Sequence, residues 1–202
     1  MLQGCVPWPQ DFARAYRAKG YWRDRPIPSV IADLATKAPD RVAIVDGAAR
    51  MTLGELNAAA AHLAAHFHSL GLRHGDRVVF QMPNAAAFFP VFLGLLRIGV
   101  IPILALPPHR ETELTHFARF GGAKALFIPQ QVGAFDFRPM AEAVRAAAPS
   151  LEHVFVEGDA LPTQISLPAL RATAADAAGD EAVARIILDA NDVALMLLSG
   201  GT

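Results

Sequence analysis

The sequence has little cysteine and no excess of charge of either sign. Its single cysteine, Cys5, excludes an internal disulfide framework and a metal site built from several cysteines, and it fits the reducing environment of the cytoplasm. Eighteen basic and 19 acidic residues give a net charge of −1, so the chain has no long-range positive field for nucleic acid or an anionic membrane. We therefore expect a cytoplasmic protein that binds neither nucleic acid nor membranes.

Several common signatures are also missing. The N-terminal stretch MLQGCVPWPQDF has no basic segment followed by an apolar one, so it lacks the pattern of a signal peptide. No Gly-x-Ser-x-Gly, Gly-x-Gly-x-x-Gly or complete Walker motif occurs, which disfavours the common hydrolase, dinucleotide-binding and P-loop classes. Residues 88–106 are apolar and about long enough to span a membrane, but Arg97 lies near their middle. We expect instead a buried helix that breaks at Gly99 and continues as a buried strand.

Short apolar runs that alternate with helical patterns are abundant. Hydrophobic residues make up 53% of the 202 residues, which is enough for one sizeable core. Expected strands lie at residues 41–47, 76–83, 100–107, 124–129, 151–158 and 192–199, and expected helices at 52–72, 85–99, 111–123, 135–150 and 166–177. This pattern predicts an α/β fold, with a mainly parallel sheet and helices on both faces. The unbroken apolar run at 193–198 predicts a strand in the interior of that sheet.

Other local signals place individual boundaries. Pro9 and Gly20 delimit a short amphipathic helix near the N-terminus. Thr52, with Glu55 three residues later, predicts a capping box at the start of a long helix. Residues 173–185 are rich in alanine and acidic residues, so we expect a surface excursion there.

Two pairs of residues that contain histidine are candidates for chemistry. His62 and His66 lie one helical turn apart and could face one metal ion, but no third ligand is identifiable, so packing or surface roles and no metal site are expected. His109 and Arg110 directly follow an apolar strand, where open α/β sheets place ligand contacts. They either line a pocket or hold their loop and cap the next helix, and the pattern favours the second role.

The last four residues, Ser199, Gly200, Gly201 and Thr202, follow a strand-like run. Glycine allows the backbone N–H groups to approach an anion closely, and the two hydroxyls can donate hydrogen bonds to phosphate oxygens. Such residues are common in turns, so their position relative to other motifs decides their meaning.

This segment resembles the opening of the Ser/Thr/Gly-rich phosphate loop of the adenylate-forming enzymes. Three more motifs of that superfamily occur in order upstream: APDRVAIVDG at 38–47, MTLGELN at 51–57, with Leu53 in place of a tyrosine, and LLRIGVIPILALP at 95–107. The segments VPWPQDFARAYRAKGYW, LALPPHRETELTH and LLSGGT are similar to the aryl-acid-activating branch, the 2,3-dihydroxybenzoate–AMP and salicylate–AMP ligases of siderophore biosynthesis.

The resemblance covers residues 6–202 but less than half of such an enzyme. It implies that the chain is the N-terminal portion of a large adenylation domain, in which residues 1–40 form an extension with a short helix and residues 41–202 an α/β subdomain. The chain would end inside the phosphate loop. The rest of the large domain and a mobile C-terminal domain with its catalytic lysine would lie beyond Thr202, so no catalytic residue is expected here.

The resemblance also implies a reaction. An aryl carboxylate attacks the α-phosphate of Mg·ATP, and the aryl group then passes to a phosphopantetheine thiol on a carrier protein. Ser199 and Thr202 would supply hydroxyls, and Gly200 and Gly201 backbone donors, to the pyrophosphate half of ATP. No tightly bound cofactor is expected, and the 202-residue chain alone should be inactive. The alternatives are an aryl- or acyl-CoA ligase of the same superfamily and a non-catalytic nucleotide-binding or interaction domain.

Overall fold

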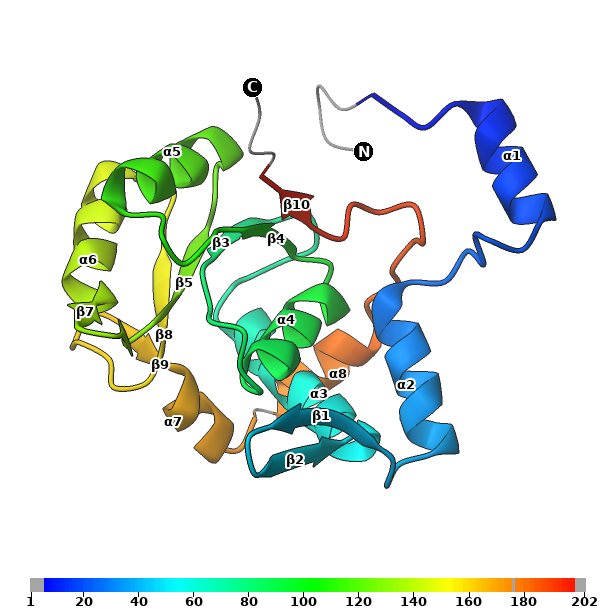
Figure 1. Cartoon of the computed structure of the whole chain (residues 1–202), viewed down its shortest axis with the longest axis horizontal. Helices are drawn as coiled ribbons and strands as arrows, with labels where there is room; N and C mark the ends of the chain where they lie inside the picture. Colours follow the sequence, from blue (N-terminus) through cyan, green and yellow to red (C-terminus); the bar gives the residue numbers. More distant parts are fainter. Residues whose placement is uncertain (1–5, 176, 199–202) are drawn as a thin grey trace.

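A parallel six-stranded sheet forms the centre of the molecule, with strand order β10-β4-β3-β5-β8-β9 (Figure 1). The computed structural model describes residues 6–175 and 177–198. Every neighbouring pair in this sheet is parallel. The strands are β3 (Arg77–Phe80), β4 (Ile101–Leu104), β5 (Ala125–Pro129), β8 (His153–Glu157), β9 (Ile165–Ser166) and β10 (Met196–Leu197). The predicted α/β class is confirmed.

Helices cover both faces of this sheet (Figure 1). Successive strand residues point to opposite faces, so each strand contributes to two cores. Phe80, Phe127 and Phe155 pack against one helical layer, and Val79 and Leu126 against the other. The first layer contains α3 (Leu53–Ser69), α4 (Phe88–Arg97), α7 (Leu167–Ala172) and α8 (Ala177–Ala184), and the second contains α5 (Glu111–Gly121) and α6 (Phe137–Ala147). The prediction of helices on both faces is confirmed.

Local sequence signals set several helix ends. The backbone N–H of Glu55 donates to the Thr52 hydroxyl at 3.2 Å, and the Thr52 N–H donates to the Glu55 carboxylate at 2.8 Å. This is the predicted capping box, and it satisfies two backbone donors at the start of α3. α1 (Gln10–Ala18) begins after Pro9 and ends before Gly20, whose φ of +72° is in the glycine-favoured region.

The long apolar stretch at residues 88–106 also behaves as predicted. It forms α4, turns at Gly99 with a φ of +69°, and continues as β4. A side chain at Gly94 would lie only 3.1 Å from the Ala60 carbonyl oxygen, so glycine allows α4 to approach α3 closely. Within residues 6–175 and 177–198, no helix combines the length and the apolar character that a membrane span requires.

The described residues of the range 173–185 lie mostly at the surface, as expected, but they include a regular helix, α8, and not only an irregular excursion. α8 forms there and packs on α3, and Gly179 is buried in the contact. A Cβ at Gly179 would lie 2.7 Å from the Ser69 hydroxyl and 3.1 Å from the Ala65 carbonyl oxygen. Alanine favours helix and leaves little bulk, so this stretch can form a helix that lies close to another one.

The prediction of an interior strand at residues 193–198 is also wrong. β10 covers only Met196–Leu197, pairs with β4 alone, and lies at the edge of the sheet among the described strands. The side chain of Leu197 is 73% exposed. An unbroken apolar run indicates that a strand has apolar surroundings, but the pairing with other strands decides its place in the sheet. Among the described residues, β10 has β4 on one side and no strand on the other.

Several elements were not anticipated. α2 (Ile27–Lys37) follows α1, and its Ile31 packs against the small core between α3 and α4. β1 (Val42–Asp46), an expected strand, pairs antiparallel with β2 (Ala49–Thr52) in a separate two-stranded sheet. A second short hairpin consists of β6 (Gln131–Val132) and β7 (Phe135–Asp136). The strands β6 and β7 are two residues each, too short to show a period, whereas α2 does carry apolar residues at helical spacing, Ile27, Val30, Ile31 and Leu34, a signal that the sequence analysis overlooked.

Candidate functional site

The carboxyl ends of the parallel strands lie along one edge of the central sheet, the edge at which open α/β sheets bind ligands. In register, Leu197 of β10 lies beside Leu104 of β4, which lies beside Phe80 of β3. Gln81, the turn at residues 106–109 and Leu198 therefore leave the sheet side by side. The predicted phosphate-binding residues follow Leu198 directly and lie outside the described residues: Ser199, Gly200, Gly201 and Thr202.

Gln81 is the buried polar residue of this edge, with a side chain only 1% exposed. Its Nε2 donates to the carbonyl oxygens of Leu106 at 2.7 Å and His109 at 3.0 Å. Two carbonyl acceptors fix the orientation of the amide, because the reverse orientation would place oxygen against oxygen. Among the described residues, its Oε1 is a buried acceptor without a partner. Sequence reasoning missed Gln81, although a polar residue at the end of an apolar strand was a signal.

His109 closes the turn that Gln81 holds. Its backbone N–H donates to the Leu106 carbonyl oxygen at 3.0 Å, and its Nδ1 accepts from the Leu106 N–H at 3.0 Å. The ring meets Phe117 of α5 edge to face, with 5.2 Å between centroids. Because Nδ1 accepts this hydrogen bond, Nε2 is the ring nitrogen that can donate one.

Arg110 stands at the start of α5 and is engaged locally. Its backbone N–H donates to the Glu113 carboxylate at 2.9 Å, and this bond is the main cause that lowers the pKa of Glu113. Its guanidinium donates to the carbonyl oxygens of Pro107 at 2.7 Å and His109 at 2.8 Å, and it lies 4.3 Å from the ring centroid of Phe135. Arg110 thus stabilises the turn at residues 106–109 and the start of α5.

A pocket between α5 and β10 connects these features. Its lining is mostly aromatic and aliphatic and comes from Ile103, His109, His116, Phe117, Phe120, Gly121, Met196, Leu197 and Leu198. His109 and the residues that immediately precede Ser199 therefore line the same space. The structure brings His109 and the end of β10 together, as expected for residues at one edge of the sheet.

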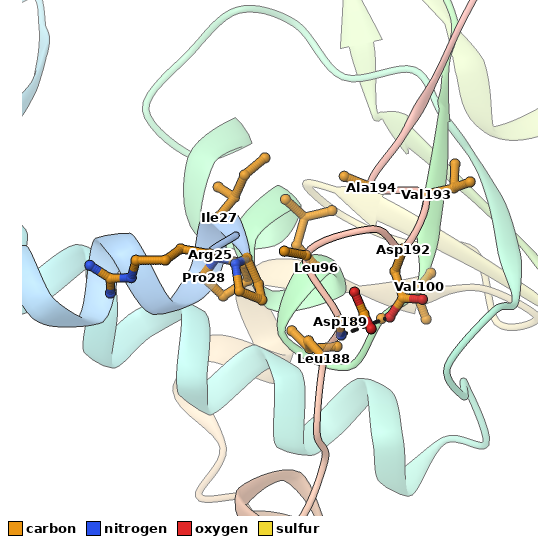
Figure 2. A pocket seen from close by; sticks show the side chains of 13 residues that line it. Arg25, Ile27, Pro28, Leu96, Val100, Leu188, Asp189, Asp192, Val193 and Ala194 are labelled. Carbon is orange, nitrogen blue, oxygen red and sulfur yellow. Dashed lines mark hydrogen bonds between the residues drawn. The ribbon is translucent and has the colours of Figure 1, made fainter. Parts of the chain in front are cut away.

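Figure 2 shows a second pocket, which lies where the chain approaches β10 from the other end. The segment at residues 188–194 passes between the start of α2 and the end of α4, and Leu188 and Leu96 contribute to the lining. Its volume of about 150 Å³ is below the roughly 300–1,000 Å³ of ligand pockets. This pocket is too small for a nucleotide, and we interpret it as a packing seam that positions the segment entering β10.

Asp192 anchors that segment. Its carboxylate accepts from His74 Nε2 at 2.9 Å and from the backbone N–H of Asp189 at 3.0 Å. These bonds, with His74 as the largest cause, lower the pKa of Asp192. The His74 ring in turn lies against Gly99, where a Cβ would meet its Cδ2 at 2.3 Å. Gly99 thus leaves the space that His74 needs to hold the segment.

His62 and His66, the pair considered as metal ligands, contact the end of another helix. His62 Nε2 lies 3.1 Å from the Leu170 carbonyl oxygen, and His66 Nε2 lies 3.1 Å from that of Thr173. Both bonds tie α3 to the C-terminal end of α7. In the part of the chain that the structure describes, no group of three His, Cys, Asp or Glu side chains could hold a metal ion.

Comparison with known proteins identifies the class of protein that this fold and edge define. The family model described as AMP-binding enzyme matches residues 31–202, and the chain belongs to this family. It is 41% identical to a salicyl-AMP ligase / salicyl-S-ArCP synthetase of Mycobacterium tuberculosis and 38% identical to a 2,3-dihydroxybenzoate-AMP ligase of Bacillus subtilis. Both matches cover 100% of this chain, but only 35% and 36% of those relatives.

A solved structure supports the same assignment. The apo structure of MbtA from Mycobacterium smegmatis is 40% identical and matches with a TM-score of 0.86, over 98% of this chain and 36% of that chain. The resemblance to the aryl-acid-activating branch, drawn from the motifs, is therefore confirmed. The chain spans about a third of the length of these relatives.

Proposed function

We propose that this chain is part of an ATP-dependent enzyme that adenylates salicylate or 2,3-dihydroxybenzoate for siderophore biosynthesis. In this reaction a carboxylate oxygen attacks the α-phosphorus of Mg·ATP, the bond to pyrophosphate breaks, and aryl-AMP forms. The aryl group then passes to a phosphopantetheine thiol on a carrier protein. The observation that carries the proposal is the similarity to aryl-acid–AMP ligases along the whole chain.

Ser199, Gly200, Gly201 and Thr202 are proposed to bind the pyrophosphate half of ATP. Their position in the sequence supports this role, because they follow a strand that ends at the ligand-binding edge of a parallel sheet. Two hydroxyls and glycine backbone N–H groups are suitable donors for phosphate oxygens. Mg²⁺ would enter with ATP as part of the substrate.

Residues 1–40 are proposed to form an extension, and residues 41–202 a subdomain that needs further chain to complete its site. The edge position of β10 supports this, as do the 73% exposure of Leu197 and the 83% exposure of Phe120. Relatives about three times as long have room for the missing groups. Groups that act as a unit lose most activity when some are absent, so the 202-residue chain alone should not adenylate.

Aryl-acid-dependent exchange of labelled pyrophosphate into ATP tests the proposal. We expect exchange from a protein of the relatives' full length that carries this chain, and none from the 202-residue chain above a control without acid. Exchange by the short chain would contradict the proposed division of the site. A full-length protein that exchanges with neither acid would favour a non-catalytic domain, and acyl transfer to coenzyme A rather than to a carrier would identify a CoA ligase.

The phosphate assignment has its own test in the full-length protein. Thr202→Ala and Gly200→Val should slow adenylate formation more than they weaken aryl-acid binding. One lost hydrogen bond to a charged group costs roughly 1.5–3 kcal/mol, or about ten- to a hundredfold in rate if it strengthens in the transition state. Thr36→Ala, an exposed change on α2, is the matched control. Unchanged exchange rates with weaker acid binding would instead assign the loop to the acyl pocket.

A further inference from the structure

We infer that residues 8–23 form a docking surface for a separate protein, and that this protein is the carrier that receives the aryl group. We call the surface the aromatic face, and it includes the basic side chains beside its rings. The rings belong to Trp8, Phe12, Tyr16, Tyr21 and Trp22. The inference rests on the proposed function and deepens it, because it assigns a part of this chain to the carrier.

The composition of the aromatic face differs from that of the core. Both tryptophans and both tyrosines of the chain lie between residues 8 and 22. The buried core of the described residues contains phenylalanine and aliphatic side chains, but neither tryptophan nor tyrosine. Tryptophan and tyrosine combine a large apolar ring with a polar group, and with arginine they contribute most of the binding energy at protein interfaces. The composition therefore indicates an interface.

The aromatic face holds its own shape. The ring centroid of Tyr16 lies 6.1 Å from that of Trp8 and 5.6 Å from that of Trp22. The two tryptophan rings lie 6.0 Å apart. Outer parts of the cluster stay open to solvent, since Trp8, Phe12 and Tyr21 are 53%, 51% and 69% exposed. Rings that are held in place by each other form a surface that loses little entropy when a partner binds.

Basic side chains accompany the rings. Residues 8–25 contain five basic and two acidic side chains, although the whole chain has a net charge of −1. Lys19 and Arg23 form no ion pair with a described residue. The Lys19 Nζ lies 6.0 Å from the ring centroid of Tyr21, and Arg23 lines a pocket with Trp22. The aromatic face therefore fits a partner that carries negative charge.

The unpaired cations favour one occupant over the others. A segment of the same polypeptide that covered the face permanently would have to bury these charges, at a desolvation cost. A second copy in a symmetric contact would bring one positive face against another. A carrier protein must leave once it is loaded, and the phosphodiester that attaches its phosphopantetheine group is an anion. Charge complementarity speeds the encounter of such a transient partner without burying the cations permanently.

The place of α1 agrees with this role. α1 stands apart from the central sheet and its covering helices, and β10 ends on the same upper side of the view (Figure 1). The Arg17 guanidinium donates to the side-chain oxygen of Asn191 at 2.8 Å, within the segment that leads into β10. A protein docked on the aromatic face therefore lies beside the chain that enters the ligand-binding edge of the sheet.

Two double variants of a full-length protein that carries this chain test the aromatic face. Phe12→Ala with Tyr21→Ala removes two exposed rings, and Lys19→Glu with Arg23→Glu reverses two charges. The assays are aryl transfer at varied concentrations of the phosphopantetheine-bearing carrier protein, and pyrophosphate exchange without carrier. We expect each double variant to raise the KM of the carrier about tenfold and to leave pyrophosphate exchange unchanged. Salt should reduce the effect of the charge reversal but not that of the ring removal.

Matched controls alter the same kinds of side chain elsewhere. Val45 is 61% exposed on β1, and Lys37 is exposed at the end of α2. Val45→Ala and Lys37→Glu should leave both the KM of the carrier and pyrophosphate exchange unchanged. A rise in the KM of the carrier in these controls equal to that in the double variants would overturn the inference, because the effect would then not belong to the aromatic face.

Three other results would assign the aromatic face to a different occupant. A lower Tm and slower pyrophosphate exchange after ring removal, with an unchanged KM of the carrier, would show that the rest of the polypeptide covers it. A change from dimer to monomer in sedimentation, with the same unchanged KM, would show that a second copy does. Binding of the wild type, but not of the charge variant, to phosphatidylglycerol vesicles, again with an unchanged KM, would identify a membrane surface.

Hydrogen exchange separates docking from activity. α1 has few contacts with the body of the molecule, so a docked partner should slow amide exchange at residues 10–23 of the full-length protein. If the carrier protein slows exchange there in a protein that adenylates neither acid, the proposed function fails and the docking surface stands. If the protein adenylates an aryl acid but the carrier slows exchange only in other segments, the proposed function stands and the inference fails.

Discussion

Replacing Gly99 by alanine should destabilise the fold more than its single methyl group suggests. Gly99 joins α4 to β4 with a φ of +69°, a conformation that costs an alanine about 1–2 kcal/mol. The new Cβ would also lie 2.3 Å from Cδ2 of His74, whose Nε2 holds the Asp192 carboxylate at 2.9 Å. The ring would have to move and release the segment that leads into β10.

Both costs can be worked out separately. Forcing an extra methyl into a packed contact costs typically 1–3 kcal/mol, so Gly99→Ala should lose about 2–5 kcal/mol in the free energy of unfolding. Gly133→Ala is the matched control, because Gly133 has a φ of +59° and a methyl group added there would have nothing within 4 Å. This control carries only the backbone cost of about 1–2 kcal/mol.

Urea denaturation followed by far-UV circular dichroism measures both variants. In a His74→Ala background the clash is absent, so Gly99→Ala should then cost about as much as Gly133→Ala. Such non-additivity is expected for residues in direct contact. Equal losses for Gly99→Ala and Gly133→Ala in the wild-type background would refute the reasoning, because His74 would then not constrain position 99.

Three further predictions concern stability. The pKa of Asp192 is lowered, so its bonds stabilise the fold above the ordinary unfolded pKa of about 3.9, and this contribution disappears as the pH falls. In Asp192→Asn the free energy of unfolding should therefore decrease less between neutral and acidic pH than it does in the wild type. Thr52→Ala should lose about 0.5–2 kcal/mol in urea, and Thr36→Ala under about 0.5 kcal/mol. Phe127→Ala, which removes a buried ring stacked on Phe155 at 4.4 Å, should lose about 3–5 kcal/mol in the same assay. The first prediction fails if the stability difference between Asp192→Asn and the wild type does not change with pH. The second fails if Thr52→Ala and Thr36→Ala lose equal stability, and the third if Phe127→Ala loses much less than the expected amount.

The sequence by itself determined the features that depend on neighbouring residues. The Thr52 and Glu55 capping box, the break at Gly99 and the alternation of helices with apolar strands all follow from hydrogen bonds and periodicity within a few positions. The motifs at residues 51–57 and 95–107 indicated the superfamily, and the segments at 6–22, 104–116 and 197–202 indicated its aryl-acid-activating branch. Each signal is short-range, so the linear order of the residues contains it.

Only the tertiary structure decided which distant residues meet. Gln81 reaches the turn at residues 106–109 across 25 and 28 positions, and His74 reaches Asp192 across 118. The edge place of β10 likewise depends on pairing with β4, not on its own composition. A buried amide, an imidazole tautomer and a strand order are each set by partners from other elements, and folding brings those partners together only when the whole core packs.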